Sequence, residues 1–247
     1  MEKVISRMEE SKTVILNSPH SIRKRLFNKK KTVTVVITTY NSAIFIKKCV
    51  ESVIEQTLPF ETIELIIVDD GSHDDTPIIL SNYAKEYKNI TVVLLAENTG
   101  SAAIPRNIGI ELSTTDKIIF LDSDDWFNKN ALSSLVMAMD ESGDDVVLGQ
   151  TIKVEDKGES IHAEFISYTR RENVNAFEFP YLFYYMGPQS KLIKTSVIKE
   201  NDIRFEEMKF GEDKLFLYML VANSYFHKLY WRTYENKLKK LMKIVIS

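Results

Sequence analysis

The sequence predicts an α/β fold: a doubly wound, mostly parallel sheet flanked by helices, with short appendages at both ends. From Thr32 onward, short runs of β-branched residues alternate with segments of helical periodicity. Regular alternation of this kind is typical of parallel sheets whose strands are joined by helices. Two of the apolar runs end directly in acidic clusters, and such sheets bind ligands at the carboxyl ends of their strands.

The predicted strands are apolar runs rich in valine and isoleucine, as expected for parallel strands that are buried on both faces. They cover residues 33–37, 63–68, 90–95, 117–121 and 146–148. After Gln150 the alternation weakens through a polar and then aromatic-rich stretch, and it returns at residues 190–193 and 195–200.

The predicted helices lie between these runs, at about residues 46–54, 76–87, 98–112 and 128–141, with a last helix after Gly211. Ile46, Val50 and Val53 recur at the spacing of one helix face. Pro77 lies in the first turn of the second helix, where proline is favoured.

Composition and charge exclude several classes of protein. The formal net charge of −3 gives no overall basic field, so no nucleic-acid partner is predicted. Cys49 is the only cysteine, which rules out an internal disulfide and predicts a reducing, cytoplasmic setting. No apolar stretch approaches the ~18 residues of a membrane-spanning helix, and the first residues lack the apolar core of a signal peptide.

Positive charge nevertheless gathers near both ends of the chain. Basic residues crowd residues 22–31, and they alternate with apolar residues over 237–244. Either segment could lie on an anionic lipid surface, which predicts peripheral contact with the inner face of the cell membrane. The alternative is a solvated arm and a solvated final helix.

The acidic cluster after the 117–121 strand is the strongest sign of chemistry. Asp122 and Asp124 are two positions apart, so on a continuing strand both carboxylates would face the same side. A hard cation such as Mn²⁺ or Mg²⁺ needs few protein carboxylates when a diphosphate supplies other oxygens. The alternative is a solvated turn in which an aspartate caps the next helix.

A second acidic cluster, Asp69 and Asp70, follows the 63–68 strand and precedes a turn at Gly71 and Ser72. A carboxylate at this place could accept the imide N–H of a uracil, a contact that cytosine cannot make because it lacks that proton. The two clusters together suggest two neighbouring parallel strands that deliver acids to one crevice.

Two helix starts carry further candidates. Asn98 and the residues after it open a helix that contains Arg106, and helix N-termini and arginine both suit phosphate. A surface salt bridge is the alternative for Arg106. Glu212 and Asp213 open the last helix, where simple capping by the helix dipole is one interpretation. In the other interpretation, Asp213 is a general base that the dipole keeps ionised.

Six motifs occur in one order along the chain: Val35–Asn41, Ile67–Ser72, Asn98–Gly100, Pro105–Gly109, Leu121–Asp125 and Gly211–Asp213. With this set the sequence resembles a family 2 glycosyltransferase of the GT-A fold, over about residues 32 to 220. Residues 187–216 and the Pro105-Arg106-Asn107 segment look most like wall teichoic acid sugar transferases of Gram-positive bacteria, the poly(ribitol-phosphate) N-acetylglucosaminyltransferases.

The resemblance implies inverting transfer of a sugar, N-acetylglucosamine or glucose, from a UDP-sugar to a hydroxyl of a polysaccharide or polyol-phosphate acceptor. It makes Asp213 the catalytic base and Asp124 the ligand of Mn²⁺ or Mg²⁺, and it puts Asp122 on the ribose. The remaining substrate-binding residues that it implies are Thr38, Tyr40, Asp69 or Asp70, Asn98, Arg106 and Glu212.

The resemblance also divides the chain into four parts. Residues 32–150 would be the nucleotide-sugar-binding half, and residues 151–222 the acceptor-binding and catalytic half. Residues 1–31 and 223–247 would be basic appendages.

Two alternatives remain open. A nucleotidyltransferase is expected to carry a basic, glycine-rich loop after its first strand, whereas residues 38–42 read Thr-Thr-Tyr-Asn-Ser. A truncated, inactive paralogue that binds a nucleotide-sugar or a partner chain is favoured by the short segment after Asp213, because the teichoic acid enzymes continue into further domains. The presence of Asp122, Asp124 and Asp213 argues against that second alternative.

Overall fold

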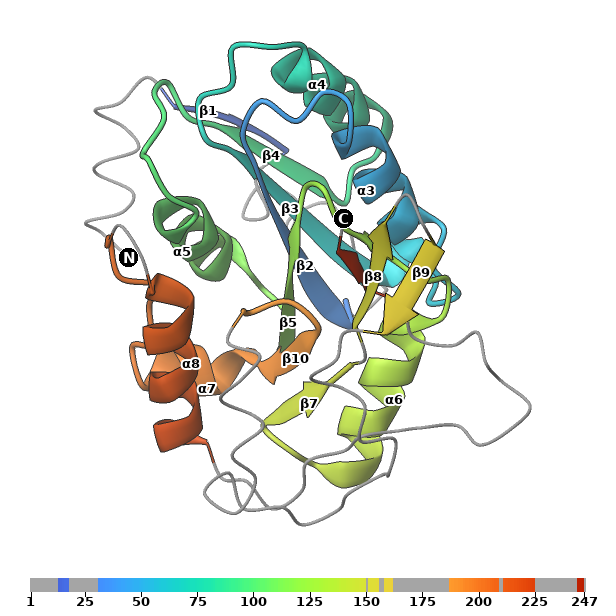
Figure 1. The fold of residues 1–247 in the computed structure, drawn as a ribbon, viewed down its shortest axis with the longest axis vertical. Coiled ribbons are helices and arrows are strands. Elements are labelled where there is room, and N and C mark those ends of the chain that lie inside the picture. Colours follow the sequence, from blue (N-terminus) through green and yellow to red (C-terminus); the bar gives the residue numbers. More distant parts are fainter. Residues whose placement is uncertain are drawn as a thin grey trace.

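The computed structural model describes residues 13–17, 31–149, 151–155, 158–161, 187–208, 211–224 and 244–246. Within these residues, helices cover both faces of a seven-stranded central sheet (Figure 1). The arrangement confirms the predicted doubly wound, mostly parallel α/β fold.

The central sheet has the strand order β1-β4-β3-β2-β5-β10-β7. Four consecutive strands are parallel to one another: β4 (Ile90–Leu94), β3 (Ile63–Asp69), β2 (Val33–Thr39) and β5 (Lys117–Asp122). β10 (Lys191–Lys194) runs antiparallel between β5 and β7 (Val146–Leu148). Every residue of β2 and β3 is buried, which explains why most of them are valine, isoleucine or leucine.

The two acidic clusters do not lie on neighbouring strands, so that prediction is wrong. β2 lies between β3 and β5, and its Thr38 is opposite both Val68 of β3 and Asp122 of β5. The chain winds from β2 through β3 to β4 on one side and then returns to β5 on the other. β2 is therefore the point at which the winding reverses, and crevices at such points bind ligands.

Alternation along β2 divides the core into two layers. Val33, Val35 and Ile37 share a core with α3 (Ile46–Ile54), α4 (Thr76–Glu86) and α6 (Ala131–Ser142), and this core includes Cys49. Val36 shares the opposite core with α5 (Ala103–Leu112), α7 (Thr195–Glu200) and α8 (Glu212–Asn223). A Cβ at Gly109 would lie 2.3 Å from Val36 Cγ1, so glycine is what lets α5 pack this close to the sheet.

Two helices begin later than the sequence predicted. α5 begins at Ala103 because residues 98–102 form a loop, in which the side chain of Asn98 bonds to Asp70. α6 begins at Ala131 because Trp126–Phe127 forms a short strand, β6, and a turn follows it.

The described part of the N-terminal appendage includes a short strand at the edge of the central sheet. β1 (Val14–Leu16) pairs antiparallel with β4 at the edge of the sheet, and Asn17 Nδ2 donates to Ile90 O at 3.2 Å. Lys31 Nζ donates to Ile63 O at 3.0 Å. Residues 22–30 and 237–243 of the two basic segments lie outside the described residues. The aromatic-rich stretch near residues 177–185 lies outside them as well. Membrane contact therefore stays a prediction.

A smaller sheet has the order β6-β11-β8-β9 and includes β8 (Thr151–Glu155), β9 (Gly158–Ile161) and β11 (Ile244–Ile246). A turn of 3-10 helix, η1 (Phe60–Thr62), precedes β3. Among the residues that the structure describes, no helix has both the length and the apolar character needed to cross a membrane.

Candidate functional site

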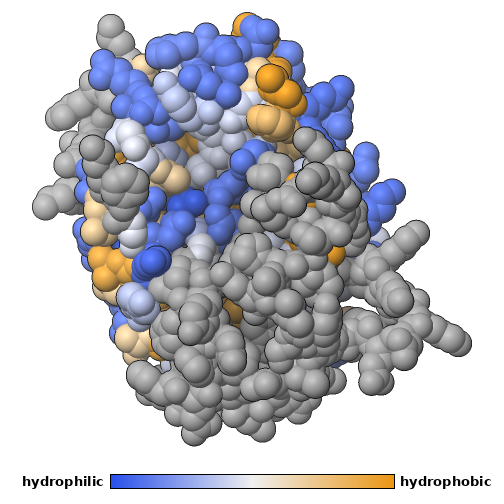
Figure 2. Space-filling model, viewed as in Figure 1, coloured by the Kyte–Doolittle hydropathy of each residue, from blue (hydrophilic) through white to orange (hydrophobic). Residues whose placement is uncertain are grey.

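The candidate site lies where β2, β3 and β5 end and β10 begins. A cavity of about 360 Å³ opens between the ends of β2 and β3 and the loop before α5. Its lining includes Thr38, Tyr40, Asp70 and Asn98, all of which the sequence predicted to contact the nucleotide. On the face shown in Figure 2, hydrophilic side chains form a band across the middle of the described surface.

Asp70 ties the end of β3 to the loop before α5. Its carboxylate accepts hydrogen bonds from Asn98 Nδ2 at 3.0 Å and from Thr99 N at 3.0 Å. Burial raises the pKa of Asp70, and the hydrogen bonds from Thr99 oppose that shift. The next residue, Gly71, has a φ of 71°, and a Cβ there would lie 2.6 Å from Asn98 N. Glycine therefore permits both the turn and the close approach of the two loops.

Asp69 has a different role from Asp70, although the sequence treated them as interchangeable. Its carboxylate accepts hydrogen bonds from Ser72 N at 3.1 Å and from Ser72 Oγ at 2.5 Å. Asp69 is buried and is not among the residues that line the cavity. It closes the turn after β3, which leaves Asp70 as the carboxylate at the cavity.

The loop after β2 is fastened to the loop before α4. Ala43 N donates to Asp74 Oδ2 at 3.0 Å, and Ser42 N donates to Thr76 Oγ1 at 2.9 Å. These bonds explain Asp74 and Thr76 as structural residues. Tyr40 is held at the rim of the cavity with 45% of its surface exposed, so its ring is available to a ligand.

Arg106 is the centre of the charged part of the site. Only 4% of the residue is exposed, and its guanidinium bridges two carboxylates. Nη1 lies 2.6 Å from Asp213 Oδ1, and Nη2 lies 2.9 Å from Asp122 Oδ1. Burial alone would lower the pKa of Arg106, but the charges of Asp122 and Asp213 outweigh it and the pKa is raised. Each terminal nitrogen carries a second N–H, and Nε is buried without a hydrogen-bond partner among the described residues, so the guanidinium keeps donors beyond these two bonds.

Asp122 is held from two sides at the end of β5. Arg106 engages its Oδ1, and the amide Nε2 of Gln189 donates to its Oδ2. Gln189 reaches this place because it forms a parallel bridge with Phe120, just before the antiparallel pairing of β10 with β5. The carboxylate of Asp122 is thus fixed in orientation before any ligand binds.

Asp124 does not continue the strand, so the predicted strand alternation of Asp122 and Asp124 is wrong. β5 ends at Asp122, and a turn follows in which Asp125 N donates to Asp122 O at 3.0 Å. Ser123 Oγ lies 2.8 Å from Ser42 Oγ, which links this turn to the loop after β2. Asp124 is an exposed residue, but partial burial of its carboxyl group raises its pKa, and the charge of Asp122 adds to the effect.

A divalent cation fits the chemistry of this turn. A bound cation would relieve the repulsion between Asp124 and Asp122 that raises the pKa of Asp124. Among the described residues there is no group of three or more His, Cys, Asp and Glu side chains able to hold a metal. Oxygens of the substrate would therefore have to complete the coordination, as is common for Mg²⁺.

Asp213 and Glu212 lie in the first turn of α8, after Gly211 with its φ of 92°. Burial raises the pKa of Asp213, the charge of Arg106 opposes this shift, and the charges of Asp122 and Glu212 add to it. The sequence predicted that the helix dipole keeps Asp213 ionised, whereas the structure adds a desolvated setting in which its proton is held more tightly than usual.

Sequence reasoning missed two residues at this site. Gln189 contacts Asp122, and Lys191 at the start of β10 is completely buried within reach of the charge of Asp213. One signal was present, because Lys191 directly precedes the apolar pair Leu192-Ile193 and so sits in a strand that is otherwise core.

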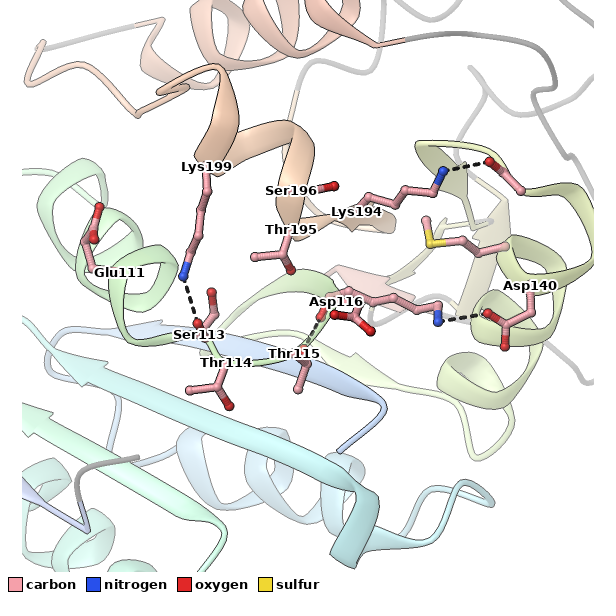
Figure 3. A pocket seen from close by; sticks show the side chains of 13 residues that line it. Glu111, Ser113, Thr114, Thr115, Asp116, Asp140, Lys194, Thr195, Ser196 and Lys199 are labelled. Atoms are coloured by element: carbon pink, nitrogen blue, oxygen red, sulfur yellow. Dashed lines mark hydrogen bonds and ion pairs between the residues drawn. The ribbon is translucent and has the colours of Figure 1, made fainter. Parts of the chain in front are cut away.

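A larger cavity, about 660 Å³, lies at the opposite end of β5 and β10 (Figure 3). Its lysines have local partners: Lys117 lies 2.8 Å from Asp140, Lys194 lies 2.8 Å from Asp145, and Lys199 Nζ donates to Ser113 O at 2.8 Å. None of the residues predicted for the site lines this cavity.

Comparison with known proteins agrees with this geometry. Residues 34–200 match the model of the family described as glycosyl transferase family 2. The poly(ribitol-phosphate) β-glucosyltransferase of Bacillus spizizenii is 35% identical over 74% of this chain and 28% of its own length. The poly(ribitol-phosphate) β-N-acetylglucosaminyltransferase TarP of Staphylococcus aureus is 33% identical over 78% of this chain and 58% of its own length.

A solved structure supports the same assignment. The structure of S. aureus TarS 1–349 in complex with UDP-GlcNAc has a TM-score of 0.74 and 27% identity, over 87% of this chain and 59% of that chain. The chain thus spans between about a quarter and three fifths of the proteins it matches here. Because the family model covers most of the chain and a relative is 35% identical over 74% of it, this protein belongs to glycosyltransferase family 2.

Proposed function

We propose that the chain transfers N-acetylglucosamine or glucose from a UDP-sugar to a hydroxyl of a polyol-phosphate or polysaccharide acceptor of the cell wall. The observation that carries the proposal is the Arg106 bridge. It holds Asp213, the candidate base, beside Asp122 at the strand end next to the nucleotide cavity. The names of the relatives support the substrate class, since they use poly(ribitol-phosphate) as acceptor and glucose or N-acetylglucosamine as the sugar.

The nucleotide would occupy the cavity between Tyr40 and Asp70. Tyr40 would stack on the uracil, and the Asp70 carboxylate would accept its imide N–H, since Asp69 is occupied by Ser72. Thr38 and Asn98 line the same cavity. Asp122 would contact the ribose in the orientation that Arg106 and Gln189 give it.

The reaction would be a single inverting displacement. The acceptor oxygen bonds to the anomeric carbon while the bond from that carbon to the diphosphate breaks, and the departing UDP keeps the electron pair. The acceptor proton passes to Asp213, at Oδ2, because Arg106 engages Oδ1. Burial favours this role, since a pKa raised toward the working pH makes a carboxylate a stronger base.

Mn²⁺ or Mg²⁺ would be held by Asp124, and when bound it would neutralise charge that builds on the diphosphate. Glu212 would add negative charge beside Asp213, where it opposes ionisation of the base and further raises its pKa. Peripheral contact of the basic segments with a membrane, and a cytoplasmic location, belong to the same proposal.

The test combines donor binding with transfer. Calorimetric titration with UDP, UDP-glucose and UDP-N-acetylglucosamine, with and without Mn²⁺, should rank the donors and show metal-dependent binding that Asp124→Ala removes. Asp213→Asn should lower kcat by about 10²- to 10⁴-fold, the usual contribution of a positioned base, with UDP affinity unchanged. An equal loss of UDP binding in Asp213→Asn would contradict its role as base. Binding of UDP without transfer in the wild type would favour the inactive paralogue.

A further inference from the structure

Lys191 is a buried cation that the proposed reaction does not use. It is the first residue of β10, none of its surface is exposed, and its neighbours Leu192 and Ile193 belong to the two cores. Burying a lysine disfavours its charged form, and burial lowers the pKa of Lys191 to about 7 despite the opposing effect of Asp213. A residue this costly to bury calls for a specific reason.

The ammonium folds back over the turn that precedes β10. Nζ donates to Gly187 O at 2.5 Å, and Gln189 O lies 3.4 Å away. Within this turn Ser190 has a φ of 58°, a left-handed conformation that a residue with a side chain rarely adopts. Such conformations persist only where the surroundings hold them. Lys191 supplies such support by bonding to carbonyls on the other side of the strained residue.

The turn matters because Gln189 projects from it onto Asp122. A chain of contacts then connects the buried lysine to the candidate base: Gln189 to Asp122, Asp122 to Arg106, and Arg106 to Asp213. Any shift of the turn would move the Gln189 amide away from Asp122 Oδ2. The carboxylate of Asp122 would then be held only by its hydrogen bond to Arg106, and its orientation could change.

We propose that Lys191 is a positioning residue for the transfer reaction: it closes the 187–190 turn and thereby keeps the Gln189 amide on Asp122. The effect on catalysis rests on the proposed function, whereas the effect on Gln189 does not. Lys191 touches no substrate in this scheme. It acts through the orientation of Asp122 and of the Arg106 bridge.

The chain offers a matched control on the same strand. Lys194, at the other end of β10, also bonds to a turn, since its Nζ donates to Gly143 O at 2.7 Å (Figure 3). The same Nζ lies 2.8 Å from Asp145 Oδ1. This lysine lies in the cavity remote from the site. Lys191→Met and Lys194→Met thus remove the same group from two ends of one strand.

The first readout needs no activity. In a ¹H–¹⁵N spectrum, the side-chain amide of Gln189 is identified by its disappearance in Gln189→Ala. Lys191→Met should move this signal toward the position of a solvated glutamine, and Lys194→Met should leave it in place. An unmoved signal in a folded Lys191→Met protein would overturn the proposal, whether or not the protein transfers sugar.

The second readout is a double-mutant cycle on transfer. Lys191→Met and Gln189→Ala should each lower kcat by about 10- to 100-fold, because displacing a site by about 1 Å can cost a hundredfold, and donor KM should rise as well, because Asp122 is the proposed ribose contact. If Lys191 acts through Gln189, the double variant should lose no more than the worse single variant. If the fold-losses in kcat of the two single variants multiply in the double variant, Lys191 does not act through Gln189. Failure of the wild type to transfer any sugar would count against the proposed function alone, since the amide signal still tests the inference.

Discussion

The two ends of β5 and β10 carry similar residues in opposite arrangements. At the amino end of β5, Lys117 pairs with Asp140 and Lys194 with Asp145, one cation to one carboxylate, at the rim of an open cavity (Figure 3). At the carboxyl end, Asp122 and Asp213 share Arg106, which is almost completely buried. An ion pair near solvent contributes little to stability. When two carboxylates share one buried cation, removing that cation leaves both carboxylates without their partner. The burial of the shared cation thus distinguishes the candidate site from the solvated ion pairs at the other end of β5.

The largest effect should come from removing the shared cation. Arg106→Met leaves the carboxylates of Asp122 and Asp213, whose side chains are 28% and 29% exposed, without their buried partner, and the cost should approach the value of about 3–5 kcal/mol for breaking a buried pair. We expect a lower free energy of unfolding in urea titrations and loss of transfer. Lys194→Met is the control, because Lys194 pairs with Asp145 at 2.8 Å at the remote end and 35% of its side chain is exposed. Equal losses of stability in the two variants would remove the distinction between the two ends.

The pH dependence of transfer should reflect the raised pKa of Asp213. Burial raises the pKa of Asp213, so kcat/KM should fall with decreasing pH at values above the ordinary aspartate pKa of about 3.9. The folded state holds this proton more tightly than the unfolded chain, so the contribution of Asp213 to stability decreases as pH rises through the raised pKa. A pH–rate profile measures the first effect. An acid limb at or below the ordinary value would count against Asp213 as the base.

The smallest effect should come from the remote end. Lys117→Met removes a pair in which 60% of the Asp140 side chain is exposed, so the free energy of unfolding should change by no more than about 1 kcal/mol. Transfer kinetics should stay within the error of the wild type. Thermal unfolding and a standard transfer assay check both points. A large loss of transfer would mean that the remote cavity takes part in the reaction.

The sequence predicted the strands and helices well because buried strands and amphipathic helices leave periodic patterns. It could not predict strand order, since nothing in the residues of β3 and β5 shows that β2 lies between them. It located Asp70, Arg106, Asp122 and Asp213 through local motifs. The division of labour between Asp69 and Asp70 depends on hydrogen bonds to Ser72 and Thr99, which motifs do not encode.

The contacts of Gln189 and Lys191 could not be predicted from the sequence for a different reason. Each depends on the antiparallel insertion of β10 beside β5, a pairing between segments far apart in the chain. The predicted strand alternation of Asp122 and Asp124 failed as well, because a backbone hydrogen bond from Asp125 N to Asp122 O forms a turn that residue type does not indicate.

The short strand β1 has a consequence for how molecules of this protein behave toward one another. Val14–Leu16 occupies the hydrogen-bonding edge of β4, which would otherwise present unpaired N–H and C=O groups along a flat apolar strand. Exposed edges of that kind recruit strands from other molecules and seed aggregates. The three residues of β1 therefore replace a five-residue edge strand by a shorter one, and a chain shortened to begin at Thr32 should precipitate more readily on concentration.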